Sequence, residues 1–467
     1  MFTYVRLKNF KSLGEITFDF RKRKDVKSCK DVKQFIAVYG ENGSGKSNFV
    51  EGLAWLGLSI INFASRGFIE KIFNDISETS ADVQEKVHKL ISKKISRYAF
   101  AGYRMVDCDK PTEVEYGLLI DGKEWVYTLK FTDRLIEETL YGMRNSIRGV
   151  IFNISYCDTG DIRKTFWSEL FRSDKFKNDL FDEIDKYWGK YSFLSIFAHY
   201  KDEMNIEYIV KNVNRRLFEF IGHALNMSAS ILDSDGEMPL GIGCKIFPED
   251  LTSGIINEES VSVIETTEKI LNNFFVQTYA DIKDVFYIKE PVKEGKIKYT
   301  LHLKKMIAGS VRTLPFEWES SGTKNLLKKV GYILCSFWNG VSVCDEIDNG
   351  THDLLVESIL LSAKDEIETL SKKAEEDGEE FTGQLIITTH NTLLLESLKP
   401  ADVYIIDVDY LGNKEAVCLS EYSIQKSDNK RLKYLKGLFG GVPMADSIDF
   451  ESIIEYGYEA AENREDD

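Results

Sequence analysis

The chain has 467 residues, a hydrophobic fraction of 43% and a formal net charge of −16 at pH 7. This length predicts two or three lobes, each with its own core. The charge excludes a protein that is built as a whole to hold nucleic acid, because it would repel a phosphate backbone at long range. No run approaches the ~18 apolar residues of a membrane span, and the first residues lack the layout of a signal peptide, so we expect a cytoplasmic protein without membrane contact.

The amino-terminal part of the chain reads mainly as strands. Alternating polarity predicts strands at 3–10 and 14–20, and an apolar run at 34–40 predicts a buried strand that ends in glycine. A helix is expected from Lys46, because apolar residues follow it at helical spacing. Two further strands around an Asp-Gly turn are expected within 112–131.

The middle of the chain has a different residue pattern, with long amphipathic stretches rich in aromatic residues. This pattern predicts a mainly helical insertion. Strands resume after it, so pieces of one sheet are expected on both sides of the insertion. The expected division is an amino-terminal lobe at 1–154, the insertion at 155–278, a carboxy-terminal lobe at 279–425, and an extension with an acidic tail at 426–467.

The strongest motif is GENGSGKS at Gly40–Ser47, which matches GxxxxGK[ST] between a predicted strand and a predicted helix. Its glycines let successive backbone N–H groups face phosphate oxygens, and the helix amino end adds a positive dipole end. We expect Lys46 to contact the β and γ phosphates of ATP and Ser47 to ligate Mg²⁺. The alternative, an ordinary glycine loop, fits the flanking pattern poorly. The residues expected to touch the nucleotide here are Gly40, Asn42, Gly43, Ser44, Gly45, Lys46, Ser47 and Asn48.

Two acids, Asp345 and Glu346, follow the apolar run VSVC. Phosphoryl transfer needs an acid that holds magnesium and a group that orients water, so we expect Asp345 to hold the metal and Glu346 to act as general base. Many strands end in acids, so the pair indicates a catalytic site only in combination with the phosphate loop.

His390 follows another apolar run, LIITT. The alternative is that this histidine is an ordinary surface or capping residue. Because a parallel sheet gathers its site at one edge, we expect His390 to sense the γ phosphate.

The stretch ESSGTKNLL at 319–327 places small hydroxyl residues at a predicted helix start, far from the phosphate loop in sequence. Backbone amides and hydroxyls at a helix start form an anion cradle. The sequence therefore predicts a second cradle, and both cradles could grip one nucleotide.

This order of motifs resembles that of the ABC-type ATPases, and more closely that of the SMC-like and RecF-like heads, in which an insertion separates the two halves of the ATPase. The resemblance implies an α/β fold: an ABC-type P-loop NTPase head with a mixed central sheet flanked by helices. It implies that Ser320, Ser321 and Gly322 form the signature motif, which contacts the γ phosphate held by the other subunit. It also places His352 at the end of the D-loop. A homodimer that encloses ATP, or a higher oligomer of such dimers, is the implied assembly.

Five motifs in order, RLKNFKSL, ESSGTKNLL, DEIDNGTHDLL, TTHNTLLL and YLKGLFGGVP, resemble those of AAA-type, OLD-like ATPases of bacterial antiphage and abortive-infection operons, including the ATPase subunits of PARIS systems. The resemblance implies a sensor or switch that controls a separate effector, such as a Toprim nuclease or a toxin, with a phage protein as trigger. Relatives often show LHP where this chain has Thr351–Asp353, which leaves the role of His352 open.

Asp407 and Asp409 could suggest the paired metal-binding acids of a Toprim nuclease. We expect them to be structural, because too few residues follow them for that fold. Two other functions remain open: a RecF-type or SMC-like repair ATPase that acts directly on DNA, and a self-contained nuclease. DNA contact is compatible with the sequence but is not required by it.

Overall fold

The structure is a computed structural model. It describes residues 1–76, 98–145, 147–203, 205–233, 236–241, 247–248, 250–292, 295–425, 428–442, 450–451 and 453–456. Much of the expected extension with its acidic tail lies outside these ranges. Within them, no helix combines the length and apolar character needed to cross a membrane.

A sheet with the strand order β10-β9-β15-β16-β3-β17-β18 forms the centre of the molecule. The inner strands β9, β15, β16, β3 and β17 run parallel, and β10 and β18 pair antiparallel at the two edges. Its strands are β3 (Phe35–Gly40), β9 (Met227–Asp233), β10 (Gly236–Gly241), β15 (Val341–Cys344), β16 (Gln384–Thr388), β17 (Val403–Val408) and β18 (Lys414–Cys418).

The central strands are apolar almost throughout because both faces of the sheet are covered, as parallel sheets require. On one face, Ile36 and Val38 of β3 pack in the core that contains α1. On the other face, Ala37 and Tyr39 pack in a core with α9 and α10. The helices around this sheet are α1 (Lys46–Ile76), α8 (Ser321–Cys335), α9 (Asp353–Glu376), α10 (Thr392–Ser397) and α11 (Lys430–Leu435).

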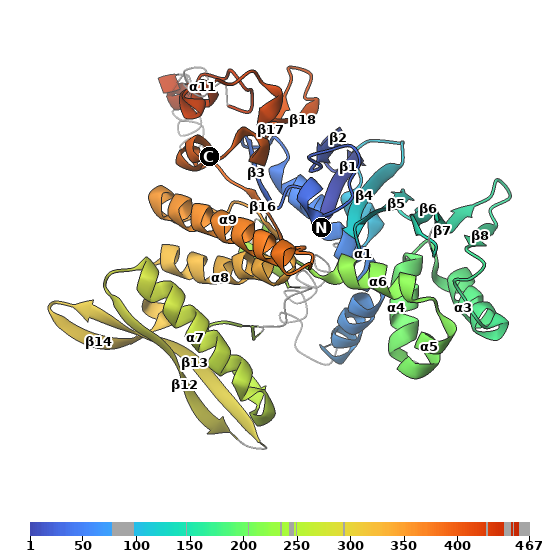
Figure 1. The fold of residues 1–467 in the computed structure, drawn as a ribbon, viewed down its shortest axis with the longest axis horizontal. Coiled ribbons are helices and arrows are strands. Elements are labelled where there is room, and N and C mark those ends of the chain that lie inside the picture. The colour runs from blue at the N-terminus through green and yellow to red at the C-terminus, as the bar shows by residue number, and fades with distance from the viewer. Residues whose placement is uncertain are drawn as a thin grey trace, which may run out of the picture.

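A second, antiparallel sheet lies beside α1, with the strand order β2-β1-β4-β5-β6-β7-β8 (Figure 1). The expected Asp-Gly turn is confirmed: Asp121 and Gly122 both have positive φ, and Ile120 pairs with Lys123. The strands are β1 (Phe2–Phe10), β2 (Leu13–Asp19), β4 (Thr112–Ile120), β5 (Lys123–Phe131), β6 (Leu135–Met143), β7 (Arg148–Tyr156) and β8 (Ile162–Phe166), and the helices that follow them are α3 (Asp174–Tyr187), α4 (Phe193–Glu203), α5 (Ile206–Asn212) and α6 (Arg215–Leu225).

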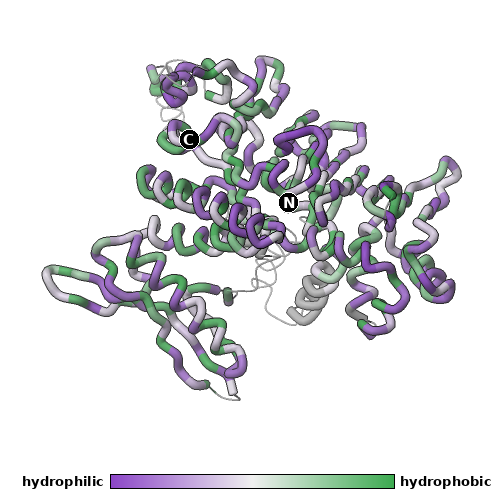
Figure 2. Tube along the Cα trace, viewed as in Figure 1, coloured by the Kyte–Doolittle hydropathy of each residue, from purple (hydrophilic) through white to green (hydrophobic). Residues whose placement is uncertain are grey.

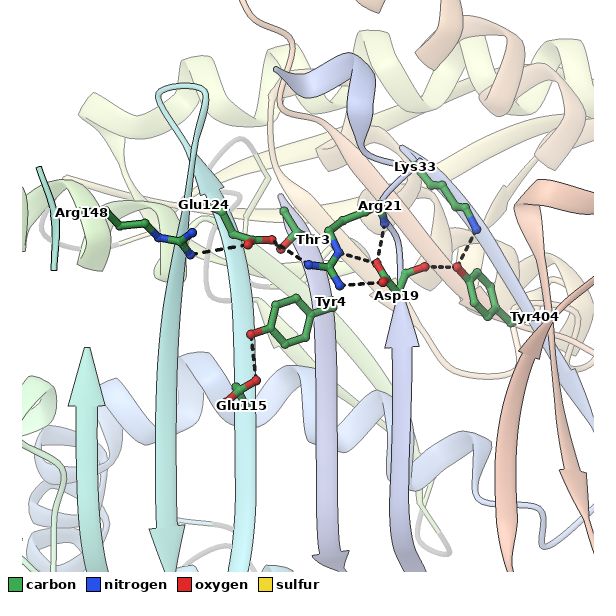
Figure 3. A network of polar contacts seen from close by, with 9 residues as sticks. All are labelled: Thr3, Tyr4, Asp19, Arg21, Lys33, Glu115, Glu124, Arg148 and Tyr404. Carbon is green, nitrogen blue, oxygen red and sulfur yellow. Dashed lines mark hydrogen bonds and ion pairs between the residues drawn. The ribbon is translucent and has the colours of Figure 1, made fainter. Parts of the chain in front are cut away.

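A polar network joins the two sheets where β2 approaches β17 (Figure 3). The Tyr404 hydroxyl of β17 donates to the backbone oxygen of Asp19 and accepts from Lys33 Nζ at 2.6 Å. The Asp19 carboxylate pairs with Arg21 at 2.7 Å, and Arg21 lies 3.7 Å from Glu124 of β5. Strands of both sheets are therefore fixed to one another at this junction.

A separate lobe precedes α8. It contains β11 (Ser253–Asn257), α7 (Val261–Thr278), β12 (Ile282–Val292), β13 (Lys296–Ile307) and β14 (Ser310–Pro315). Figure 1 shows α7 lying along this small sheet and the lobe extending away from the central sheet. Hydrophobic and hydrophilic residues alternate along its strands (Figure 2), because one face packs on α7 in a core of its own.

The structure differs from the expected division of the chain at three points. The boundary at 154 falls inside β7, which continues the antiparallel sheet. Residues 227–233, expected in a helical insertion, form β9 of the central sheet beside β15. The boundary at 278 separates α7 from the strands on which it packs. The sequence pattern did not predict β9 as a strand of the central sheet, because Ser228 and Ser230 interrupt its apolar run although both are buried.

Candidate nucleotide-binding site

The loop Gly40–Ser47 connects β3 to α1, as the sequence predicts. Gly40 and Gly45 have φ of 157° and 103°, and a Cβ atom on Gly45 would lie 2.6 Å from Leu13 Cδ2. At the φ of Gly45 a residue with a side chain would be strained whatever space surrounds it, so the conformation of the loop favours glycine there. The loop therefore has the curled backbone that can direct its N–H groups at phosphate oxygens.

Lys46 is 5% exposed, and its Nζ donates to the carbonyl oxygens of Gly40 at 2.9 Å and Glu41 at 3.0 Å. Burial lowers its pKa, and the nearby charges of Glu346, Asp345 and Asp348 partly restore it. These acids are therefore close enough to act on the lysine electrostatically. The two backbone acceptors hold the cation at the loop, where a phosphate can replace them.

Asp345 follows β15 and is 2% exposed. Its Oδ1 accepts from Thr388 Oγ1 at 2.7 Å, whereas the buried Oδ2 has no hydrogen-bond partner in the described structure. A buried carboxylate oxygen without a partner is costly unless a cation uses it. The predicted Mg²⁺ role of Asp345 fits this geometry, because magnesium prefers such oxygen ligands.

Glu346 has a φ of 42°, a left-handed conformation that is unusual for a residue with a side chain. Two contacts hold it: its N–H donates to Thr388 Oγ1 at 2.7 Å, and its carbonyl accepts from Lys329 Nζ at 2.6 Å. Thr388, at the end of β16, thus contacts both acids. Sequence reasoning missed Thr388, and its only signal was a hydroxyl at the end of an apolar strand.

His390 follows β16 and is solvent-accessible. Its backbone N–H donates to Asp348 Oδ2 at 2.9 Å, while the buried Oδ1 of Asp348 has no partner within the described residues. Partial burial first, and then the charge of Lys46, lowers the pKa of His390 below its ordinary value, which favours the neutral ring. The histidine therefore lies among Lys46 and the acids, and Asp348 is a third acid of this cluster that the sequence did not single out.

The predicted second cradle is the amino end of α8. Ser320 is its N-cap and accepts from the Thr323 N–H at 3.2 Å, and both Ser320 and Ser321 are exposed. The buried Glu319 accepts from the Ser320 N–H at 3.2 Å and pairs with Lys305 of β13 at 2.8 Å. The backbone at the start of α8 is therefore tied to the separate lobe through Glu319.

The start of α8 packs against the loop that follows Glu346 in the same chain. A Cβ atom on Gly322 would lie 2.6 Å from the carbonyl oxygen of Gly350, so only glycine permits this approach. Farther along α8, the buried Lys329 donates to the backbone oxygens of Glu346 and Ile347 at 2.6 and 3.0 Å. The structure thus joins the predicted signature to the predicted D-loop, not to the phosphate loop.

His352 is exposed and is the N-cap of α9, where its Nδ1 accepts from the Leu354 N–H at 3.3 Å. This contact gives His352 a structural role. Its other ring nitrogen, Nε2, takes no part in the capping bond.

Asp407 and Asp409 are also structural, as expected: Asp407 accepts from the Gly441 N–H at 3.0 Å, and Asp409 holds the turn after β17.

A phosphate loop between strand and helix, with an acid pair two strands away on a parallel sheet and the first of these acids buried, defines a P-loop NTPase. Residues 35–396 match the family model described as an AAA domain, putative AbiEii toxin, Type IV TA system. The match covers most of the chain, so the protein belongs to this family of AAA-type ATPases. No curated protein matches it.

Proposed function

We propose that the protein is an ABC-type ATPase that dimerises around ATP and acts as a switch for a separate effector in antiphage defence. The proposal rests chiefly on the amino end of α8. The helix start that carries the exposed Ser320 and Ser321 packs, through Gly322, on Gly350 in the loop after Glu346 of the same chain. A nucleotide on Lys46 would then receive its second cradle from another copy, as in the ABC-type heads that the motifs resemble.

The roles of the residues follow from their positions. Lys46 would leave its two backbone acceptors and bind the β and γ phosphates, with the loop amides around them. Asp345 and Ser47 would hold Mg²⁺, which offsets phosphate charge. Glu346 would accept a proton from the attacking water, and its backbone is fixed for this by Thr388 and Lys329. His390, in its neutral form, could donate a hydrogen bond to the γ phosphate.

The switch role is supported by the family and by the link from the signature to the lobe. The family name refers to toxin–antitoxin systems. Because Asp407 and Asp409 serve structure, a nuclease or toxin is proposed as a separate chain. The Glu319–Lys305 pair joins the start of α8 to β13, so a change at the signature could reach the lobe formed by α7 and β11–β14.

The test is the Glu346→Gln variant. It keeps the size of the side chain but cannot accept the proton, so turnover should fall by about a hundredfold or more while ATP binding persists. Light scattering should then show an ATP-dependent dimer that persists. Lys46→Ala is the matched control and should neither bind ATP nor dimerise. Wild-type turnover by Glu346→Gln would contradict the proposed role.

A further inference from the structure

The site above assigns residues to the phosphates but none to the nucleoside of the ATP. In the strand order, β16 and then β15 lie on one side of β3, and they carry His390 and the acid pair. Metal and water act at the γ phosphate, so under the proposed function this end of the triphosphate points toward β15. The nucleoside must then extend to the other side of β3, toward β17 and β18.

The strands β17 and β18 form an antiparallel hairpin at the end of the central sheet on that side. Ile406 pairs with Gly40 in parallel register, so the residues after Val408 pass the start of the phosphate loop. Asp409 fixes the turn: its Oδ1 accepts from the N–H groups of Leu411 and Asn413, each at 2.8 Å. The tip is therefore preorganised.

A cation of this hairpin contacts the phosphate loop. Lys414 Nζ donates to the Gly43 carbonyl at 2.9 Å and to Ser12 Oγ at 2.8 Å, and Asn48 Nδ2 donates to the same hydroxyl at 2.7 Å. Burial lowers the pKa of Lys414. No carboxylate pairs with Lys414 in the part of the chain that the structure describes. A positive charge without a counter-ion thus lies at the loop on the side away from the acids.

The tip of the hairpin also exposes apolar surface. Tyr410 is 95% exposed and Leu411 is 70% exposed. A large aromatic ring on a fixed turn beside a ligand loop is suited to stacking, because it offers a flat surface at low entropic cost.

We propose that the β17–β18 hairpin forms the nucleoside subsite of the nucleotide held by the phosphate loop of the same chain. Tyr410 stacks on the base, and Lys414, steadied by Ser12, contacts the α phosphate. The ligand class is a nucleoside triphosphate with a purine base, since the larger ring system gives the larger stacking area.

The test compares the affinities of ATP and inorganic tripolyphosphate, which has no nucleoside, by calorimetry. Tyr410→Ala should weaken ATP binding by about tenfold, as the loss of one base–aromatic stack predicts, and should leave tripolyphosphate binding unchanged. Tyr410→Phe should restore ATP binding, because it keeps the ring. Lys414→Met should weaken both ligands. Tyr456→Ala, which removes another exposed ring, is the matched control and should alter neither affinity.

Unchanged ATP affinity in Tyr410→Ala, or an equal loss for both ligands, would overturn the nucleoside subsite. A change confined to dimerisation would do so as well, because it would assign the tip to contact with a second copy. A failure of the proposed function would give different results from these. The wild type would then bind neither ligand, or Lys46→Ala would bind both ligands as well as the wild type does.

Discussion

Thr388 holds the acid pair in place through one hydroxyl group. Its Oγ1 donates to Asp345 Oδ1 and accepts from the Glu346 N–H, both at 2.7 Å, and the side chain is fully buried. It thereby orients the proposed metal ligand and stabilises the unusual backbone of the proposed base. Its contribution to turnover should exceed its contribution to folding.

Thr388→Val keeps the shape of the side chain and removes both hydrogen bonds. Leaving two buried groups unpaired should cost about 1–3 kcal/mol of unfolding free energy. Turnover should fall by at least about tenfold at unchanged ATP affinity, because the acids lose their alignment. Thr389→Val is the control: Thr389 Oγ1 accepts from the Asn391 N–H and, among the described residues, has no hydrogen bond to either acid. Equal effects of both variants on turnover would contradict the role of Thr388.

At the scale of single residues, the sequence predicts those functional residues that belong to short continuous motifs. The glycines, Lys46 and the acid pair form compact motifs, and the structure brings Lys46 and the acids into electrostatic reach of one another. Thr388 and Lys329 could not be predicted, because their roles depend on contacts with Glu346, which lies 42 and 17 residues away in sequence. A buried threonine or lysine carries no such information by itself.

Helix α8 is coupled to the acids by the buried Lys329. Its ammonium group donates to the backbone oxygens of Glu346 and Ile347, so the helix is tied directly to the backbone of the proposed base. A buried lysine is expensive unless its donors are satisfied, which these acceptors help to do. The coupling gives the proposed signature a direct link to the hydrolytic residues.

Lys329→Met should break this link while it keeps the apolar packing of the side-chain stem. Two carbonyl groups lose their charged donor, so the free energy of unfolding should fall by about 1–3 kcal/mol. Turnover should fall more than ATP affinity, because the phosphate loop is not touched. Lys328→Met, at the exposed neighbouring position, is the control and should change neither quantity. If Lys329→Met hydrolysed ATP at the wild-type rate, the link would have no role in catalysis.

Strand β6 carries a buried acid with a consequence for stability. Glu138 is fully buried against the start of α4, and it accepts from Trp188 Nε1 at 3.0 Å and the Phe193 N–H at 2.6 Å. Burial raises its pKa from 4.5 to about 7, although these donors favour the charged form. The folded protein therefore binds this proton more tightly than the unfolded chain does.

The free energy of unfolding should accordingly contain a contribution from Glu138 that is full below pH 4.5 and is lost as the pH rises to about 7. Its size is about 3 kcal/mol. Denaturant unfolding between pH 5 and 7.5 measures it. Glu138→Gln should flatten this part of the pH profile, whereas Glu137→Gln on the opposite face of β6 should not. An unchanged slope in Glu138→Gln would assign the pH dependence to other groups.

At the level of elements, sequence patterns predict β3, α1 and the strands that carry the acids, because each is strongly apolar or strongly periodic. They fail at β9, whose buried serines hide a central strand, and at the lobe, whose strands look like those of the main sheet. Which sheet a strand joins depends on distant partners, and alternating polarity does not identify them.

At the scale of the whole molecule, the phosphate loop and the start of α8 lie in different parts of the fold (Figure 1). The phosphate loop lies at the carboxyl end of β3, an inner strand of the central sheet. The exposed start of α8 is tied to the lobe formed by α7 and β11–β14, which extends away from this sheet (Figure 1). A shared nucleotide would make ATP the link between two copies, and its hydrolysis would separate them. Symmetric dimers with two such sites are the natural closed assembly.

Mixing two inactive variants tests this shared site most directly. Ser321→Glu is suited to it, because an acid at the first turn of α8 stabilises the helix and repels a γ phosphate. Lys46→Ala and Ser321→Glu should each be inactive alone. A mixture of equal amounts should recover up to about half of wild-type turnover, since only mixed dimers form around ATP and each of them has one intact site of two. No recovery, or full activity of Ser321→Glu alone, would contradict a nucleotide shared between two copies.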